Sequence, residues 1–259
     1  NKAVLLGSTD PYDYPYMKAV LEKTDPDSRY RGALVQARDA GHIAITGKGT
    51  IDGQGRRLAL RIDSFFYAGK LDSNYYNLRR KRPERRPGDL KFLQCQDVRI
   101  SGITIKDAAN WVQTYELCSK VIIDSIRVES DAYWNNDGID IVDCSDVRIT
   151  NSFVNAADDG ICLKSEHAGH FNDNIYVANC TVRSSASAVK FGTASVGGFR
   201  NVNIKNIKVY DTFRSAIAIE CVDGGMLENV VVDGIDAVNT GNAVFIRLGH
   251  RNTDGEVGT

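Results

Sequence analysis

The sequence predicts an all-β fold, a right-handed parallel β-helix, and three observations support this prediction. Val and Ile dominate the apolar residues and glycine is frequent, with 23 in 259 residues, which favours strands and turns. A template with two β-branched residues flanking one position recurs along the chain. From the second copy onward the copies begin 23 to 28 residues apart. They start at Ile43, Val98, Val121, Val147, Ile175, Val202 and Val230.

One position inside the template is reserved for small or polar residues. This position follows the second β-branched residue by two and suits a tight turn, where stacked side chains form ladders. Its occupants are Gly47, Gly102, Ser125, Asn151, Asn179, Asn206 and Gly234. A repeat of this length with no helical periodicity predicts coils of about three short strands each.

Other repeat architectures fit the template less well. Propeller blades and helical-pair solenoids need longer repeats, and the leucine-rich signature is missing although its length overlaps. A β-sandwich would not require the same residue type at the same position of each repeat. The template therefore favours the β-helix over these alternatives.

The cysteines follow the same repeat. Cys95, Cys118 and Cys144 each stand three residues before a template valine, so they occupy equivalent positions in three successive coils. Six cysteines in one chain could instead form disulfides in an oxidising compartment. Because equivalent positions stack on one another, we expect a buried row of free thiols.

We expect one domain over residues 1–259, with a loop insertion at about 56–89 that interrupts the repeat. The insertion contains the basic run Arg79–Arg86. A glutamate and prolines within or beside the run favour a solvated loop, and an overhang that contacts an anionic substrate is the alternative. The chain starts abruptly in a strand pattern and its repeat stops without a cap, so we expect truncation at one or both ends.

The overall charge excludes some classes of partner. With 32 basic and 33 acidic residues, the net charge of −1 gives no argument for binding nucleic acid or an anionic membrane. No apolar run approaches the roughly 18 residues of a membrane span. We therefore expect neither a nucleic-acid nor a membrane partner.

Two acidic clusters stand less than one coil apart. Asp137 lies in Asn-Asn-Asp-Gly, and Asp158 and Asp159 follow 21 residues later in Asp-Asp-Gly. Stacked coils would place them on adjacent rungs, about 4.8 Å apart, with a bend at Gly160 turning both neighbouring aspartates to one surface. Three close carboxyls cannot all ionise freely, which is the condition for a general acid beside a general base. Plain turn chemistry is the alternative for each cluster alone.

These clusters resemble the family 28 glycoside hydrolases, the polygalacturonases and their pectin-degrading relatives. The resemblance rests on Asn135–Ile141 and Ala157–Gly160 at the family spacing and extends to Gly47–Gly53. It implies a right-handed parallel β-helix in an extracellular or periplasmic protein that cleaves a polysaccharide with inversion at the anomeric carbon. It also implies that Asp158 protonates the leaving oxygen, while Asp137 and Asp159 activate a water.

Two departures from the family pattern bear on the substrate. Ser187 stands where the family has histidine, and Glu220 stands where it has the last residue of an Arg-Ile-Lys motif that grips a galacturonate carboxylate. Glu220 could accept hydrogen bonds from sugar hydroxyls. Lys164 and Lys190 are candidates for a relocated anion contact, or are surface lysines. The departures favour a rhamnogalacturonan-type, other pectic or neutral-sugar linkage over ordinary galacturonan.

The remaining candidates are aromatic or imidazole side chains. Trp134, next to Asn135, is expected to stack on a sugar face and Asn135 to bind substrate, whereas Trp111 could simply fill a gap between coils. Glu-His-x-x-His at His167 and His170 lacks a third ligand, so we expect a polar loop there. We predict no metal and no cofactor, and a monomer.

The predicted function is an inverting glycoside hydrolase acting on a pectic or related plant polysaccharide. One alternative is a Ca²⁺-dependent polysaccharide lyase on the same fold, with Lys164 or Lys190 abstracting a proton. Another is a non-catalytic β-helix that binds glycans.

Overall fold

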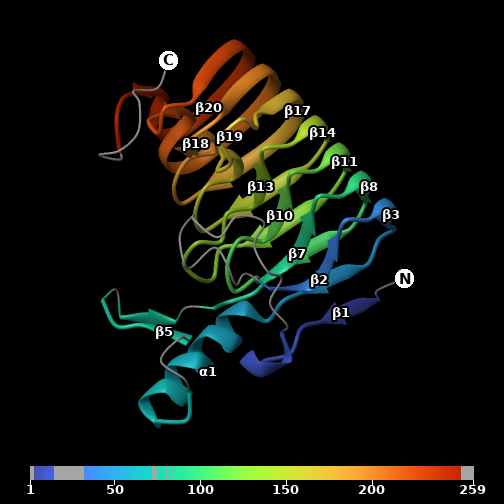
Figure 1. The fold of residues 1–259 in the computed structure, drawn as a ribbon, viewed down its shortest axis with the longest axis vertical. Coiled ribbons are helices and arrows are strands. Elements are labelled where there is room, and N and C mark those ends of the chain that lie inside the picture. Colours follow the sequence, from blue (N-terminus) through green and yellow to red (C-terminus); the bar gives the residue numbers. More distant parts are fainter. Residues whose placement is uncertain (1–2, 15–31, 72–74, 80, 84, 252–259) are drawn as a thin grey trace.

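The chain winds into a right-handed parallel β-helix, as the sequence predicts (Figure 1). The computed structural model describes residues 3–14, 32–71, 75–79, 81–83 and 85–251. Strands of successive coils pair in parallel, so that 18 strands join into one continuous sheet that wraps around the core.

Each coil contributes strands to three faces. The first face, which carries the candidate site, contains β2 (Ala33–Arg38), β7 (Gly88–Leu93), β10 (Gln113–Glu116), β13 (Ile139–Val142), β16 (Ile161–Ser165) and β18 (Val189–Ser195). The second contains β3 (Gly41–Thr46), β8 (Gln96–Ser101), β11 (Ser119–Asp124) and β14 (Ser145–Thr150). The third contains β1 (Val4–Leu6), β4 (Thr50–Asp52), β9 (Thr104–Lys106), β12 (Arg127–Ser130) and β15 (Phe153–Ala156).

Towards the C-terminus the strands run from one face to the next without a break. They are β17 (Asn172–Ser184), β19 (Gly198–Cys221) and β20 (Met226–Leu248). The end of β19 pairs with β18, and the end of β20 pairs with the end of β19, which extends the first face by two rungs.

The template residues set the register of the coils. Val121 pairs with Val98 on one side and with Val147 on the other, and the same position continues through the later coils. These side chains alternate with solvent-facing neighbours and point inward, because successive residues of a strand face opposite sides. Val98, Val121 and Val147 are all fully buried. Each such side chain stabilises the fold by about 1.5–3 kcal/mol through burial.

The tight turns lie where the template predicts them. All seven residues of the small-or-polar position have positive φ, from 51° at Asn151 to 124° at Gly47. Glycine and asparagine tolerate this left-handed region best. Asn179 donates to Asn151 Oδ1 at 3.4 Å and Asn206 donates to Asn179 Oδ1 at 3.3 Å, so the predicted side-chain ladder is present.

The prediction of buried free thiols is confirmed. All six cysteines lie within the described residues, where each is buried and none is joined in a disulfide. The backbone N–H of Cys95 donates to Cys118 Sγ at 3.4 Å, and that of Cys118 donates to Cys144 Sγ at 3.3 Å. The thiols thus form a stacked row, as expected from their shared position.

The insertion is more ordered than the loop that the sequence predicted. It contains helix α1 (Gly55–Tyr67) and the antiparallel pair β5 (Tyr76–Asn77) and β6 (Arg82–Pro83). Leu58 and Ile62, one helical turn apart, are fully buried against Tyr14, Tyr75 and Ala109. This spacing is the helical signal that the strand-centred interpretation overlooked. In Figure 1 the insertion lies beside the N-terminal coils.

Among the described residues, no helix is long and apolar enough to cross a membrane.

The inward and outward faces of one strand give a matched test of the core. Ile123→Ala should lower the free energy of unfolding by about 2–5 kcal/mol, because Ile123 is fully buried. Ile122 precedes it on the same strand and faces outward, half-buried, so Ile122→Ala should cost less than about 1 kcal/mol. Urea denaturation of both variants measures the difference, and equal losses would contradict the register.

Candidate functional site

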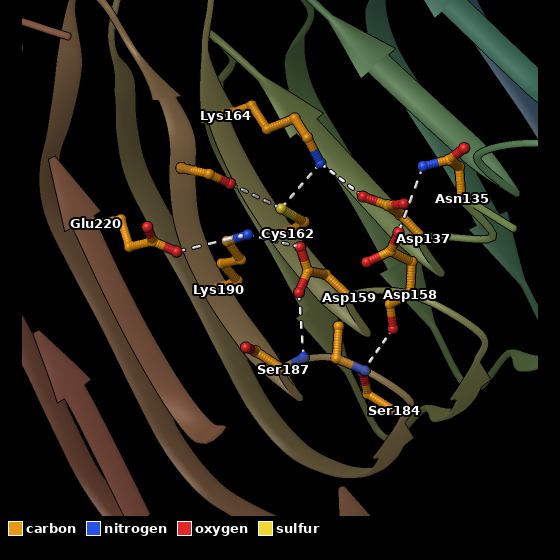
Figure 2. A network of polar contacts seen from close by, with 12 residues as sticks. Asn135, Asp137, Asp158, Asp159, Cys162, Lys164, Ser184, Ser187, Lys190 and Glu220 are labelled. Atoms are coloured by element: carbon orange, nitrogen blue, oxygen red, sulfur yellow. Dashed lines mark hydrogen bonds and ion pairs between the residues drawn. The ribbon is translucent and has the colours of Figure 1, made fainter. Parts of the chain in front are cut away.

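The three aspartates singled out by the sequence meet at one corner of the β-helix (Figure 2). Asp137 lies just before β13, and Asp158 and Asp159 lie just before β16, one coil further on. The backbone N–H of Gly138 donates to the carbonyl of Asp159 at 2.9 Å, so the two loops are joined directly. The one-rung stacking expected from the 21-residue spacing is therefore present.

Close backbone packing requires the glycines that follow the aspartates. A Cβ at Gly138 would lie 2.6 Å from the carbonyl oxygen of Gly160, and a Cβ at Gly160 would lie 2.6 Å from that of Ala188. These distances are shorter than any real side chain allows. The chain leaves the regular strand at this point, and the predicted bend between β15 and β16 is present.

Lys164 on β16 forms an ion pair with the first acidic cluster. Its Nζ donates to Asp137 Oδ2 at 2.8 Å, to Asp140 Oδ1, and to Cys162 Sγ at 3.0 Å. Nζ also lies 4.2 Å from the centre of the Trp111 ring. Burial lowers the pKa of Lys164, but Asp137 and Asp140 raise it by more, so this pKa lies well above the ordinary lysine value.

Lys190 on β18 binds the second cluster in the same way. Its Nζ lies 3.0 Å from Asp159 Oδ2 and 3.6 Å from Glu220 Oε1. Burial lowers the pKa of Lys190, yet Asp159 chiefly raises it, and the net shift is upward. The sequence left open that both lysines lie on the surface. That alternative is wrong, because only 8% of either residue is exposed.

The two aspartates of the second cluster differ in their surroundings. Asp159 is buried, pairs with Lys190, and accepts the backbone N–H of Ser187 at 3.1 Å. Asp158 is half-buried and receives a 3.5 Å hydrogen bond from Asn135 Nδ2. Burial, with Asp137 and Asp159 nearby, raises the pKa of Asp158 to about 6. Burial also raises the pKa of Asp159, against the opposing effect of Lys190.

A cation already fills the space between the ligand atoms that a metal could bridge. Carboxylate oxygens of Asp137 and Asp140 and Sγ of Cys162 lie within 4.8 Å of one another. Lys164 Nζ contacts all three. The set therefore fits an ammonium group, and Ca²⁺, which prefers oxygen ligands, fits a cluster containing a thiol poorly.

Arg86 corrects the prediction for the basic run. The sequence favoured a solvated loop over Arg79–Arg86, yet Arg86 is only 2% exposed. Its guanidinium donates to the carbonyl oxygen of Trp134 at 2.6 Å and to Asn135 Oδ1 at 2.9 Å. Arg79 in the same run is exposed, as predicted. The insertion thus reaches into the loop that carries Asp137.

The aromatic candidates take different places. Trp134 is 59% exposed, which leaves its ring open to a ligand. Trp111, for which the sequence allowed a mere filling role, covers the ammonium of Lys164. His167 is buried and bonded to Glu116 Oε1 at 3.0 Å, whereas His170 is exposed.

The residues at the two departures from the family pattern lie beside the second cluster. Ser187 contributes its backbone N–H to Asp159. Glu220 faces the same ammonium as Asp159, from the opposite side of Lys190 (Figure 2). All predicted site residues thus fall within one connected region of the first face.

Three residues of the site were not predicted. Asp140 is fully buried in the apolar strand β13, and a charged residue at such a position signals a hidden partner. Cys162 lies opposite Asp140 in the parallel pairing of β13 with β16. Aligning these two strands in the sequence would have placed Cys162 beside Asp140. Nothing in the sequence distinguishes Arg86 from its basic neighbours.

Comparison with known proteins agrees with the fold. The curated relatives include a probable polygalacturonase of Vitis vinifera, 26% identical over 248 residues, which cover 90% of this chain and 47% of that protein. A probable polygalacturonase of Arabidopsis thaliana is 30% identical over 168 residues, 62% of this chain and 35% of that protein. The chain thus spans half or less of the length of these relatives.

Solved structures match the fold. An exopolygalacturonase of Thermotoga maritima superposes with a TM-score of 0.74 at 23% identity, covering 98% of this chain and 64% of that one. A polygalacturonase of Erwinia carotovora gives 0.72 at 15% identity, covering 95% and 66%. The model of glycosyl hydrolases family 28 matches residues 16–212, most of the chain. On this match the chain belongs to glycosyl hydrolases family 28.

Proposed function

We propose that this chain is an inverting glycoside hydrolase that cleaves a pectic polysaccharide, of the rhamnogalacturonan or galacturonan type, or a related plant polysaccharide. The observation that carries the proposal is the unequal environment of three adjacent carboxyl groups. Asp158 has a pKa raised to about 6, while Asp137 and Asp159 are each held by a lysine ammonium. Unequal carboxyl groups are what general acid and general base catalysis requires.

The roles follow from these environments. Asp158, partly open to solvent, donates its proton to the leaving glycosidic oxygen. Asp137 and Asp159 accept hydrogen bonds from a water, and one of these carboxylates takes a proton from it as its oxygen attacks the anomeric carbon from the other side of the sugar. Lys164 and Lys190 keep these two carboxylates in place. Lys164 uses its three N–H groups on Asp137, Asp140 and Cys162, whereas Lys190 directs a remaining N–H to a substrate oxygen.

Substrate contacts complete the site. Trp134 offers an exposed ring to the apolar face of a sugar, and Asn135 lies beside it. Glu220 accepts hydrogen bonds from sugar hydroxyls. Because it adds a carboxylate beside Lys190, it disfavours a uronate at that position. This supports a linkage with a neutral sugar next to the cleavage point, as in rhamnogalacturonan.

The same contacts weaken the lyase alternative. A lyase needs a neutral lysine to abstract a proton, but neighbouring carboxylates raise the pKa of both Lys164 and Lys190. Both therefore remain protonated near neutral pH and are poor bases. We also propose, from the family, an extracellular or periplasmic monomer that needs no cofactor.

Assay against a panel of galacturonan, rhamnogalacturonan and other plant oligosaccharides tests the proposal. New reducing ends should appear with at least one of them, and Asp158→Asn should lower the rate about 10²–10⁴-fold. An unsaturated product that absorbs in the ultraviolet would instead indicate a lyase. Full activity in Asp158→Asn would rule out the general-acid role.

The pH dependence should reflect the raised pKa of Asp158. Asp158 acts only while protonated, so kcat/KM should fall about tenfold per pH unit above roughly pH 6. Asp159 must be ionised, and its raised pKa places the acid limb above the range of an ordinary aspartate. We therefore expect a narrow bell-shaped profile of kcat/KM against pH. A flat profile from pH 5 to 9 would contradict the assignment of Asp158 as the general acid.

Lys190→Met should displace the acid limb. Lys190 opposes the effect of burial on Asp159, so its removal raises the pKa of Asp159 further. The acid limb should move to higher pH, and kcat/KM at pH 5 should fall about tenfold or more. Lys208→Met, an exposed lysine on β19, is the matched control and should keep the wild-type profile. An acid limb unchanged in Lys190→Met would show that the ion pair has no such role.

A further inference from the structure

The buried guanidinium of Arg86 joins the insertion to the loop that carries the first acidic cluster. It donates to the carbonyl oxygens of Pro83 at 3.0 Å, Ala109 at 2.7 Å and Trp134 at 2.6 Å. Nη2 of the same group donates to Asn135 Oδ1 at 2.9 Å. Its carbon Cζ lies 5.2 Å from the centre of the Tyr133 ring. The group is thus held by three segments that are distant in sequence.

This contact decides which way the Asn135 amide faces. A guanidinium only donates hydrogen bonds, so the amide oxygen of Asn135 must point at Arg86. The amide nitrogen then faces Asp158 Oδ2, 3.5 Å away (Figure 2). Without Arg86 the amide could flip and present its oxygen to Asp158. That oxygen accepts a hydrogen bond from the protonated carboxyl, whereas the amide nitrogen donates one to the carboxylate.

We propose that Arg86 is a positioning residue that holds the Asn135 amide as a hydrogen-bond donor to Asp158 and so orients the group assigned above as the general acid. The inference rests on the proposed function only for the role of Asp158. It gives the Pro83–Arg86 end of the insertion a role in positioning the site, because Arg86 is held there by Pro83. A solvated loop would have no such influence.

The expected effect has a definite sign. A donor to a carboxylate favours the ionised form, so losing it raises the pKa of Asp158 above about 6. The charged groups that face Asp158 are Asp137, Asp159, Lys164 and Lys190, and none of them is altered by a change at Arg86. A rise in the pKa of Asp158 should therefore report the loss of the hydrogen bond from the Asn135 amide.

Carbon-detected NMR titration of the Asp158 carboxyl tests the proposal without requiring turnover. Arg86→Lys keeps the positive charge but lacks the planar fork, and Asn135→Ala removes the amide while leaving Arg86 in place. Each should raise the pKa of Asp158 by roughly half a unit or more. The double variant should add little to either single change, because both break one chain of contacts. Arg79→Lys, at an exposed position of the insertion, is the matched control and should have no effect.

Activity gives a second reading once a substrate is found. The alkaline limb of the kcat/KM profile should move to higher pH in Arg86→Lys and Asn135→Ala, and kcat should fall about tenfold through misplacement of the acid. If Asn135→Ala raises the pKa of Asp158 but Arg86→Lys does not, or if their effects simply add, the proposal is overturned. If no substrate is cleaved but the titrations behave as stated, the proposed function fails and the positioning role stands.

Discussion

The parallel register between successive coils is the constraint on which both the fold and the site depend. Ile139 of β13 pairs with Ile161 of β16, and this pairing fixes the loops immediately before the two strands on adjacent rungs. Asp137 and Asp158 come together for that reason alone. A shift by one residue would turn every buried template side chain outward, so core packing and site geometry are specified together. The face that carries the site is rigid because the fully buried template side chains pack beneath it.

Charge compensation is the second requirement of the site. Asp137, Asp140 and Asp159 are buried, and burial of carboxylates without partners is costly. Lys164 and Lys190 extend from neighbouring strands of the same face and supply these partners. Asp158 instead accepts a hydrogen bond from the neutral Asn135 amide. The same two lysines therefore make the three catalytic candidates unequal.

Much of this could be predicted from the sequence, because a repeat converts position in the chain into position in space. The template valines, the turn asparagines and the row Cys95–Cys144 all stack as their equivalent positions require. Helix α1 was missed because its 13 residues are few and its apolar signal, Leu58 and Ile62 one turn apart, lies in a region without the repeat. Arg86 was misjudged since its environment comes from the loops around Ala109 and Trp134, which no local pattern encodes. Lys164 and Lys190 were recognised as candidates, but their ion pairs depend on side-chain directions that only the folded chain defines.

The stereochemistry of the reaction distinguishes the roles assigned to the three aspartates. Inverting enzymes place their carboxyl groups about 6.5–9.5 Å apart to admit a water, which is wider than the roughly 4.8 Å of one rung. With inversion, the carboxyl of Asp158 must therefore diverge from those of Asp137 and Asp159 across the glycosidic bond. Proton NMR of the first product formed from a cleaved oligosaccharide should show the anomer opposite to that of the substrate. Initial release of the same anomer would contradict the assignment of Asp158 as acid with Asp137 and Asp159 as the water-activating pair.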